Sequence, residues 1–308
     1  SVATGGLGLS DTVAANMQSN LTAFSYLLPL FGAVIVDKYI GARYTTPVGM
    51  FIAAAGYFTG GIAKSSAGVY AMIFLVSLGL ALFKNGAIIG RVITDKSQMD
   101  PAFSMRYTLV NVGAFIGTFL VGILYKDVFA KDGVLGFAPC FKMAALMMVL
   151  GGLWYIFVCW RFLGDLGKLP FKKTLTEEEK AAEAKKKEET GTKQPLTTIE
   201  KKRIGAIFVA SLFSIVFWIF WYLGYMPVYF YWAENMDWVV AGYQVPSTWF
   251  DAANSLFCVI LGPVTAALWK KLAARPQGDM SLFRKTGLGI AIIGVGYLFY
   301  AAIDIMRG

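Results

Sequence analysis

The stretch FGAVIVDKYIGARYTT, residues 31–46, places a short charged turn between two long apolar runs. The turn is built from glycines and charged residues: Gly32, Asp37, Lys38, Gly41 and Arg43. Such a turn is typical of the connection between two membrane-spanning helices when each apolar run is long enough to cross a bilayer.

The composition of the chain supports a membrane location. Of its 308 residues, 57% are hydrophobic and 15% are charged, and the mean hydropathy is +0.59. Soluble domains carry about 25% charged residues. A helix needs about 20 mostly apolar residues to cross a bilayer, and eight segments meet this requirement: 18–36, 46–63, 68–90, 103–125, 134–160, 204–230, 246–269 and 283–303. The sequence predicts an all-α polytopic membrane protein.

The net charge of +9 follows the predicted topology. Most of the 28 Lys and Arg residues fall in alternate loops, and the basic side of a membrane protein is usually cytoplasmic. We therefore expect both ends of the chain outside, a further helix before residue 1, and a cytoplasmic segment at 164–203. The charge indicates topology, not a nucleic-acid partner.

The residue types exclude several classes of chemistry. The chain has no His, which removes Ser-His and Cys-His catalysis and the commonest metal ligand. Its three Cys residues have no paired spacing, and no phosphate-binding loop of the P-loop type is present. We expect no metal, no cofactor and no enzymatic activity.

One long polar segment divides the chain. Residues 164–203 separate five predicted spans from three, so we expect a partial N-terminal bundle at 1–163, a linker at 164–203 and a partial C-terminal bundle at 204–308. The centre of the linker, Thr176–Glu189, is rich in Glu, Ala and Lys at helical spacing. A solvated helix and a disordered tether are both compatible with this composition.

The turn at residues 31–46 resembles the signature loop of the major facilitator superfamily. Gly32 would let a neighbouring helix approach closely, and Gly41 would permit a tight turn. Asp37 could face the positive N-terminal end of another helix, forming a latch that closes the cytoplasmic side. Alternatively, the charges, Lys38 and Arg43 included, only set the topology.

Further motifs resemble one branch of that superfamily, the proton-dependent oligopeptide transporters. They are LFKNGAIIG (82–90), FSMRYTLVNVGAF (103–115), LTTIEKKRIGAIFVASLFSIVFW (196–218) and WAENMDWVVAGYQVPSTWFDAANSLF (232–257). The resemblance runs from the family's second helix through its ninth. It implies the superfamily fold in the cell (inner) membrane and proton-coupled import of di- and tripeptides by alternating access, with peptide, protons and membrane lipid as partners. Two alternatives remain: a carrier of an amino acid, nitrate or peptide-like drug, and a peptide-binding sensor that does not transport.

Lys84 matches the family lysine that takes part in proton coupling and holds the peptide carboxylate. A charge within a span costs about 2.5–3.5 kcal/mol on insertion scales, so it tends to be functional. The alternative is a lysine that extends to the cytoplasmic headgroups. Asn85 and Gly86 depart from the family's usual Pro-Asn at these positions.

Other candidate binding residues also rest on the resemblance. Asn111 would bind the peptide backbone and shares a helix face with Tyr107, although a bond between helices is an equal alternative. Asn254 would help to hold the peptide amino terminus, three residues after Asp251. Tyr26 matches a tyrosine of the family's cavity, with simple packing equally possible.

Tyr222 is the main departure from the family pattern, because it stands where the family has a glutamate tied to proton movement. A phenol does not readily replace a carboxylate that must gain and lose a proton near neutrality. Trp218, Tyr222 and Tyr225 share one predicted face, which either packs in the bundle or lines the peptide site. Pro227 should kink this helix.

Overall fold

In the computed structural model, the chain forms two compact units. The first unit comprises Ser1–Ala184 and Pro246–Cys258, and the second comprises Lys185–Val245 and Val259–Gly308. The structure describes residues 5–84, 99–170, 197–224, 227–276, 278 and 280–307. The predicted linker helix at Thr176–Glu189, and Asn85, Gly86 and Tyr225, lie outside the described residues.

The first unit is helical. Its elements are α1 (Asp11–Lys38), α2 (Ala42–Ile62), α3 (Ser66–Phe83), α5 (Met99–Ile123), which continues as the π-helical turn η3 (Leu124–Val128), and α6 (Phe137–Phe162). It also contains the beginning of α10 (Thr248–Ala273).

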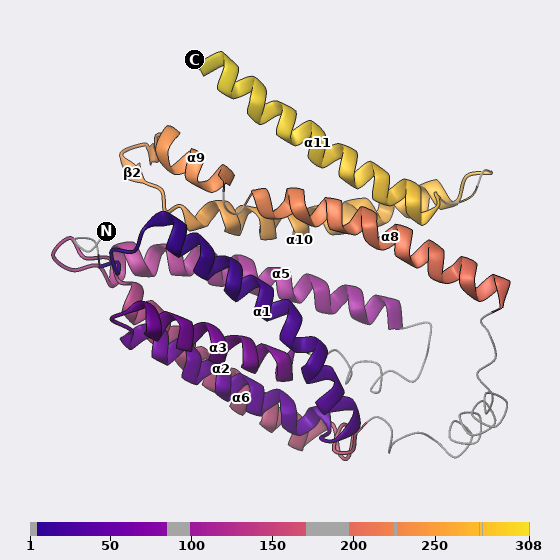
Figure 1. Ribbon diagram of the computed structural model, residues 1–308, viewed down its shortest axis with the longest axis horizontal. Helices are drawn as coiled ribbons and strands as arrows, with labels where there is room; N and C mark the ends of the chain where they lie inside the picture. Colours follow the sequence, from indigo (N-terminus) through magenta and orange to yellow (C-terminus); the bar gives the residue numbers. More distant parts are fainter. Residues whose placement is uncertain are drawn as a thin grey trace. The chain divides into compact units, whose positions relative to one another are not determined.

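Helix α2 lies against both α3 and α6, and α1 packs on α3 (Figure 1). The contact between α2 and α3 is close because glycines face each other. A Cβ atom added to Gly49 would lie 2.6 Å from the Gly79 carbonyl oxygen, and one added to Gly79 would lie 2.5 Å from the Gly49 oxygen. Small residues at such crossings are typical of membrane helices, whose backbones then approach closely.

A small apolar core joins α1 to α3. Met17 of α1 is buried against Met72, Ile73 and Val76 of α3. Most other large apolar side chains of the described residues remain exposed at the helix surfaces. Exposed apolar faces of this extent on long helices are expected where lipid is the solvent.

The second unit contains α8 (Thr198–Leu223), α9 (Pro227–Asn235), a two-stranded hairpin and α11 (Leu282–Arg307). Strands β1 (Val239–Val240) and β2 (Tyr243–Gln244) pair antiparallel. Helix α8 begins at a capping box, in which the Thr197 hydroxyl accepts from the Glu200 backbone N–H and the Glu200 carboxylate accepts from the Thr197 N–H. No residue of α8 is buried.

The predicted all-α polytopic architecture is confirmed. Eight long helices coincide with the eight predicted spans, and seven of those described are long and apolar enough to cross a membrane. The exception is α2, which combines several buried Gly and Thr residues with contacts to two other helices. A helix covered by protein does not need a fully apolar surface.

Two predicted spans end in the wrong place. The span predicted at 68–90 corresponds to α3, which ends at Phe83, so Lys84 follows the helix instead of lying inside it. The span predicted at 204–230 is divided, because α8 ends at Leu223 and α9 begins at Pro227. Pro227 starts a new helix, a position where its missing N–H costs nothing, and does not kink a continuous one.

Candidate substrate site and gating loop

Lys84 and Tyr26 lie together. Lys84 is the C-cap residue directly after α3, and its backbone N–H donates to the Leu80 carbonyl at 3.0 Å. Its Nζ lies 4.3 Å from the centroid of the Tyr26 ring of α1. This is a cation–π contact, which holds a charge beside an aromatic face without neutralising it. The C-terminal end of α3 also favours a positive charge. No carboxylate forms an ion pair with Lys84 among the residues that the structure describes.

Tyr107 and Asn111 share one face of α5, as their spacing predicts. The Asn111 amide Nδ2 donates to the Tyr107 carbonyl at 2.9 Å. The Tyr107 side chain is 64% exposed. Asn111 therefore bonds to its own helix here, whereas the sequence had suggested a bond to the peptide or to another helix. Its second N–H and its carbonyl oxygen can serve other partners.

Asp251 and Asn254 are half-buried on the first turns of α10. The Cys258 thiol donates to the Asn254 amide oxygen at 3.7 Å, one helical turn away. Asn254 is thus positioned by its own helix, as Asn111 is. Both asparagines belong to the first unit.

Tyr222 lies near the end of α8, in the second unit. Its ring stacks on Trp218 with centroids 5.9 Å apart, and Trp218 meets Trp221 edge to face at 6.2 Å. The predicted shared face of Trp218 and Tyr222 is therefore present.

Gly32 stands at a close helix contact. A Cβ atom there would lie 1.9 Å from the Ala81 carbonyl oxygen of α3, so only glycine fits without moving the backbone. The close approach predicted for Gly32 is confirmed. Asp37 and Lys38 form the last residues of α1, where Lys38 complements the negative end of the helix.

Gly41 serves a different purpose from the predicted one. Its φ of −62° and ψ of 148° are accessible to any residue, so the turn itself does not require glycine. A Cβ atom at Gly41 would instead lie 2.1 Å from the Gly167 oxygen and 2.4 Å from the Lys168 oxygen. Gly41 is needed because the backbone after α6 lies directly against it.

Arg43 completes this contact. Its backbone N–H donates to the Gly167 carbonyl at 3.1 Å, and its guanidinium donates to the Gly164 carbonyl. Gly164 and Gly167 have φ values of +49° and +76°, which residues with a side chain rarely adopt. The predicted gating loop is therefore fastened to the turn at residues 164–168, which we call the docking turn. The glycine spacing in GDLGK was the available signal for it.

Asp165 and Lys168 close the docking turn. The Lys168 ammonium donates to the Asp165 carboxylate at 2.6 Å. This hydrogen bond and the charge of Lys168, with a smaller contribution from Arg43, lower the pKa of the Asp165 carboxyl below its ordinary 3.8. The carboxylate is fully exposed, so the pair orders the turn more than it stabilises the fold.

The sequence did not predict a contact between α5 and α10. Trp249 stacks on Phe119 with ring centroids 4.6 Å apart, and its indole N–H donates to the Phe119 carbonyl at 3.3 Å. A Cβ atom at Gly122 would lie 2.6 Å from the Thr248 hydroxyl oxygen. Aromatic residues near the ends of spans are common, so no local pattern distinguished this pair.

Comparison with known proteins finds relatives along nearly the whole chain. The di-/tripeptide transporter of Lactococcus lactis subsp. cremoris is 22% identical over 352 residues, which cover 98% of this chain and 69% of that protein. A peptide transporter crystallised with alafosfalin is 24% identical, with a TM-score of 0.81 over 97% of this chain and 67% of its own. A POT family transporter crystallised with a thioalcohol-conjugated peptide is 22% identical, with a TM-score of 0.83 over 100% of this chain and 71% of its own.

These likenesses establish the fold, which is that of the major facilitator superfamily, and the chain spans about two thirds of the length of its relatives. The relatives are transporters and not enzymes, in agreement with the expectation from the residue types. The family model described as PTR2, POT family, matches residues 164–308. The protein is an integral multi-pass membrane protein whose C-terminal part, residues 164–308, is similar to the POT family of transporters.

Proposed function

We propose that this chain forms part of a carrier that imports di- and tripeptides with protons by alternating access. The similarity to the POT family and to the di-/tripeptide transporter of Lactococcus lactis supports peptides as the substrate. The carrier would lie in the cell (inner) membrane with residues 164–203 on the cytoplasmic side, as the distribution of Lys and Arg favours. Residues 1–163 and 204–308 would contribute to its two bundles.

The observation that carries this proposal within the chain is the ammonium of Lys84 on the ring of Tyr26. The ring holds the charge in place, while no described carboxylate neutralises it. A peptide carboxylate is the natural counter-ion for such a group, and the ring would remain beneath the ion pair. Lys84 would also carry the proton, because Tyr222 replaces the family's glutamate.

The amides of Asn111 and Asn254 would bind the rest of the peptide. An amide offers both donors and acceptors, which the alternating N–H and C=O groups of a peptide require. Each asparagine now bonds within its own helix, and these local bonds would be exchanged for bonds to the substrate. Tyr107 and Tyr222 would contribute aromatic walls.

Alternating access requires contacts that close one side and then release it. The contact of Phe119 and Gly122 with Trp249 and Thr248 lies at the ends of α5 and α10 that the charge pattern places outside. We infer that it closes the outer side. The gating loop, with Gly32, Asp37, Lys38, Gly41 and Arg43, would act on the cytoplasmic side.

Uptake of a labelled dipeptide into proteoliposomes, with and without an inward proton gradient, tests the proposal. Accumulation driven by the gradient supports proton-coupled import. Uptake that ignores the gradient would indicate a facilitator of peptides or a related solute. Peptide binding without any uptake would indicate a sensor.

Lys84→Ala should abolish uphill accumulation while the protein stays folded. Lys64→Ala, which removes an exposed lysine from the loop between α2 and α3, is the matched control and should transport normally. Unchanged accumulation by Lys84→Ala would remove Lys84 from the mechanism.

A further inference from the structure

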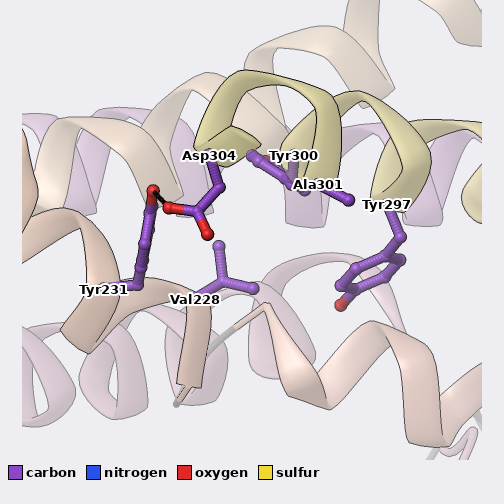
Figure 2. Close-up of a pocket in the computed structure, with 6 residues that line it drawn as sticks. All are labelled: Val228, Tyr231, Tyr297, Tyr300, Ala301 and Asp304. Carbon is purple, nitrogen blue, oxygen red and sulfur yellow. Dashed lines mark hydrogen bonds between the residues drawn. The ribbon is translucent and has the colours of Figure 1, made fainter. Parts of the chain in front are cut away.

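A separate pocket lies in the second unit, between α9 and α11. Its volume is about 390 Å³, which suits a small organic group. It is lined by Val228, Tyr231, Tyr297, Tyr300, Ala301 and Asp304 (Figure 2). Three tyrosines and one carboxylate thus surround one space, and none of the described residues that line it carries a positive charge.

The carboxylate of Asp304 is the charged group of the pocket. The Tyr231 hydroxyl donates to it across the gap between α9 and α11 (Figure 2). Asp304 also lies in the last turn of α11, at the negative end of the helix dipole, where a carboxylate is disfavoured and a cation is favoured. The pocket therefore concentrates negative potential that a neutral tyrosine offsets only in part.

The aromatic rings add to this potential. The Tyr300 ring lies 5.6 Å from that of Trp232 and meets the Tyr297 ring edge to face at 5.9 Å. The Tyr297 hydroxyl donates to the Phe220 carbonyl of α8 at 2.6 Å. Both rings are thus held in place by neighbours, and their negative faces attract organic cations.

We propose that this pocket binds an organic ammonium group, with Asp304 as its counter-ion and Tyr297 and Tyr300 as its aromatic walls. The Tyr231 hydroxyl orients the carboxylate. Helix α11 offers a span of 24 residues, about 36 Å long at 1.5 Å per residue, against an apolar layer of about 30 Å. Asp304, near one end of that span, therefore lies at headgroup depth, where the amino group of a peptide and that of a lipid headgroup are both available.

The test uses the whole chain in nanodiscs of phosphatidylglycerol, titrated with propylammonium and followed by ligand-detected NMR. Propylammonium should bind saturably, and 1-propanol, which has a similar shape without the charge, should not. Asp304→Asn should weaken propylammonium binding at least ten-fold. The amide oxygen of the asparagine can still accept a hydrogen bond from the Tyr231 hydroxyl, so this variant is expected to fold.

Matched variants separate the pocket from its surroundings. Glu234→Gln removes an exposed carboxylate from α9 that does not line the pocket, and it should bind as the wild type does. Tyr231→Phe, which keeps the carboxylate, should change the affinity by no more than a few-fold. Wild-type affinity in Asp304→Asn, or equal binding of 1-propanol, would overturn the proposal.

Two competition arms identify the source of the ammonium. Displacement of propylammonium by Ala-Ala, but not by N-acetyl-Ala-Ala, assigns the pocket to a peptide amino terminus. Loss of propylammonium binding in nanodiscs of phosphatidylethanolamine assigns it to a lipid headgroup. If neither amino group competes while propylammonium still binds through Asp304, the pocket takes an organic ammonium from another source.

Discussion

The guanidinium of Arg43 donates to the carbonyl of Gly164, 121 residues further along the chain. The loop between α1 and α2 is thereby fastened to the docking turn, the point where the chain leaves α6. Because the Arg43 N–H also bonds to Gly167, both the backbone and the side chain of one residue hold the turn. Movement of either segment must therefore involve the other.

Removal of the Arg43 side chain should loosen the docking turn. We expect Arg43→Ala to speed amide hydrogen exchange across residues 164–170, because the guanidinium bond to Gly164 is lost. Arg43→Lys should rescue this only in part, since an ammonium lacks the planar fork of donors. Hydrogen exchange followed by mass spectrometry measures the effect. Lys38→Ala, a charge removed from the same loop, is the control, and equal exchange in both alanine variants would contradict the prediction.

Gly41→Ala should destabilise the protein. The new methyl group would lie 2.1 Å from the Gly167 oxygen, so the docking turn must shift. We expect a loss of about 1–3 kcal/mol in the free energy of unfolding, the usual cost of forcing an extra methyl into a packed site. Thermal unfolding in detergent measures it.

Gly113→Ala provides the matched comparison for Gly41→Ala. Nothing lies within 4 Å of the position of its added methyl group, and alanine favours a helix by about 0.5–1 kcal/mol over glycine. This variant of α5 should unfold at the wild-type temperature or slightly above it. If both glycine variants behaved alike, steric contact at Gly41 would not be the reason for its glycine.

Tyr26 should affect substrate affinity through its ring and not its hydroxyl. Tyr26→Phe keeps the aromatic face beneath Lys84 and should transport peptide with a KM near that of the wild type. Tyr26→Leu removes a cation–π contact of about 0.5–1 kcal/mol, which corresponds to a rise in KM of about two- to five-fold. Concentration-dependent uptake in proteoliposomes distinguishes the two variants. A rise in KM for Tyr26→Phe would point to the hydroxyl instead.

The docking turn should show a measurable effect of pH. The lowered pKa of the Asp165 carboxyl means that its ion pair stabilises the turn fully above the ordinary pKa of 3.8, and that this contribution is lost as pH falls through the lower pKa of the folded state. Lys168→Met should raise the pKa of the Asp165 carboxyl, which carbon-13 NMR of labelled aspartate follows directly. Lys64→Met should leave that titration unchanged. An unchanged Asp165 titration in Lys168→Met would show that Lys168 is not the cause.

The helices were predictable because lipid imposes a simple requirement on length and apolarity. The ends of the helices were less predictable, since they depend on local hydrogen bonds. The start of α8 is set by the capping box of Thr197 and Glu200, a pattern visible in the sequence before the apolar run begins. Contacts between distant segments left no such local trace. Gly41 was predicted to permit a tight turn, whereas the structure shows that the backbone at Gly167 lies against it, a contact that no local pattern indicates.

A disulfide between α5 and α10 should stop transport reversibly. A Cβ atom added to Gly122 would lie 2.6 Å from the Thr248 hydroxyl oxygen. A double variant, Gly122→Cys with Thr248→Cys, should therefore form a disulfide under mild oxidation. The native cysteines, Cys140, Cys159 and Cys258, are first replaced. If this contact closes the outer side, the cross-linked protein cannot release it, and peptide uptake should fall to background and return with a reductant. Each single-cysteine variant should transport in both conditions. Cross-linked protein that transports at the wild-type rate would show that α5 and α10 do not separate during the cycle.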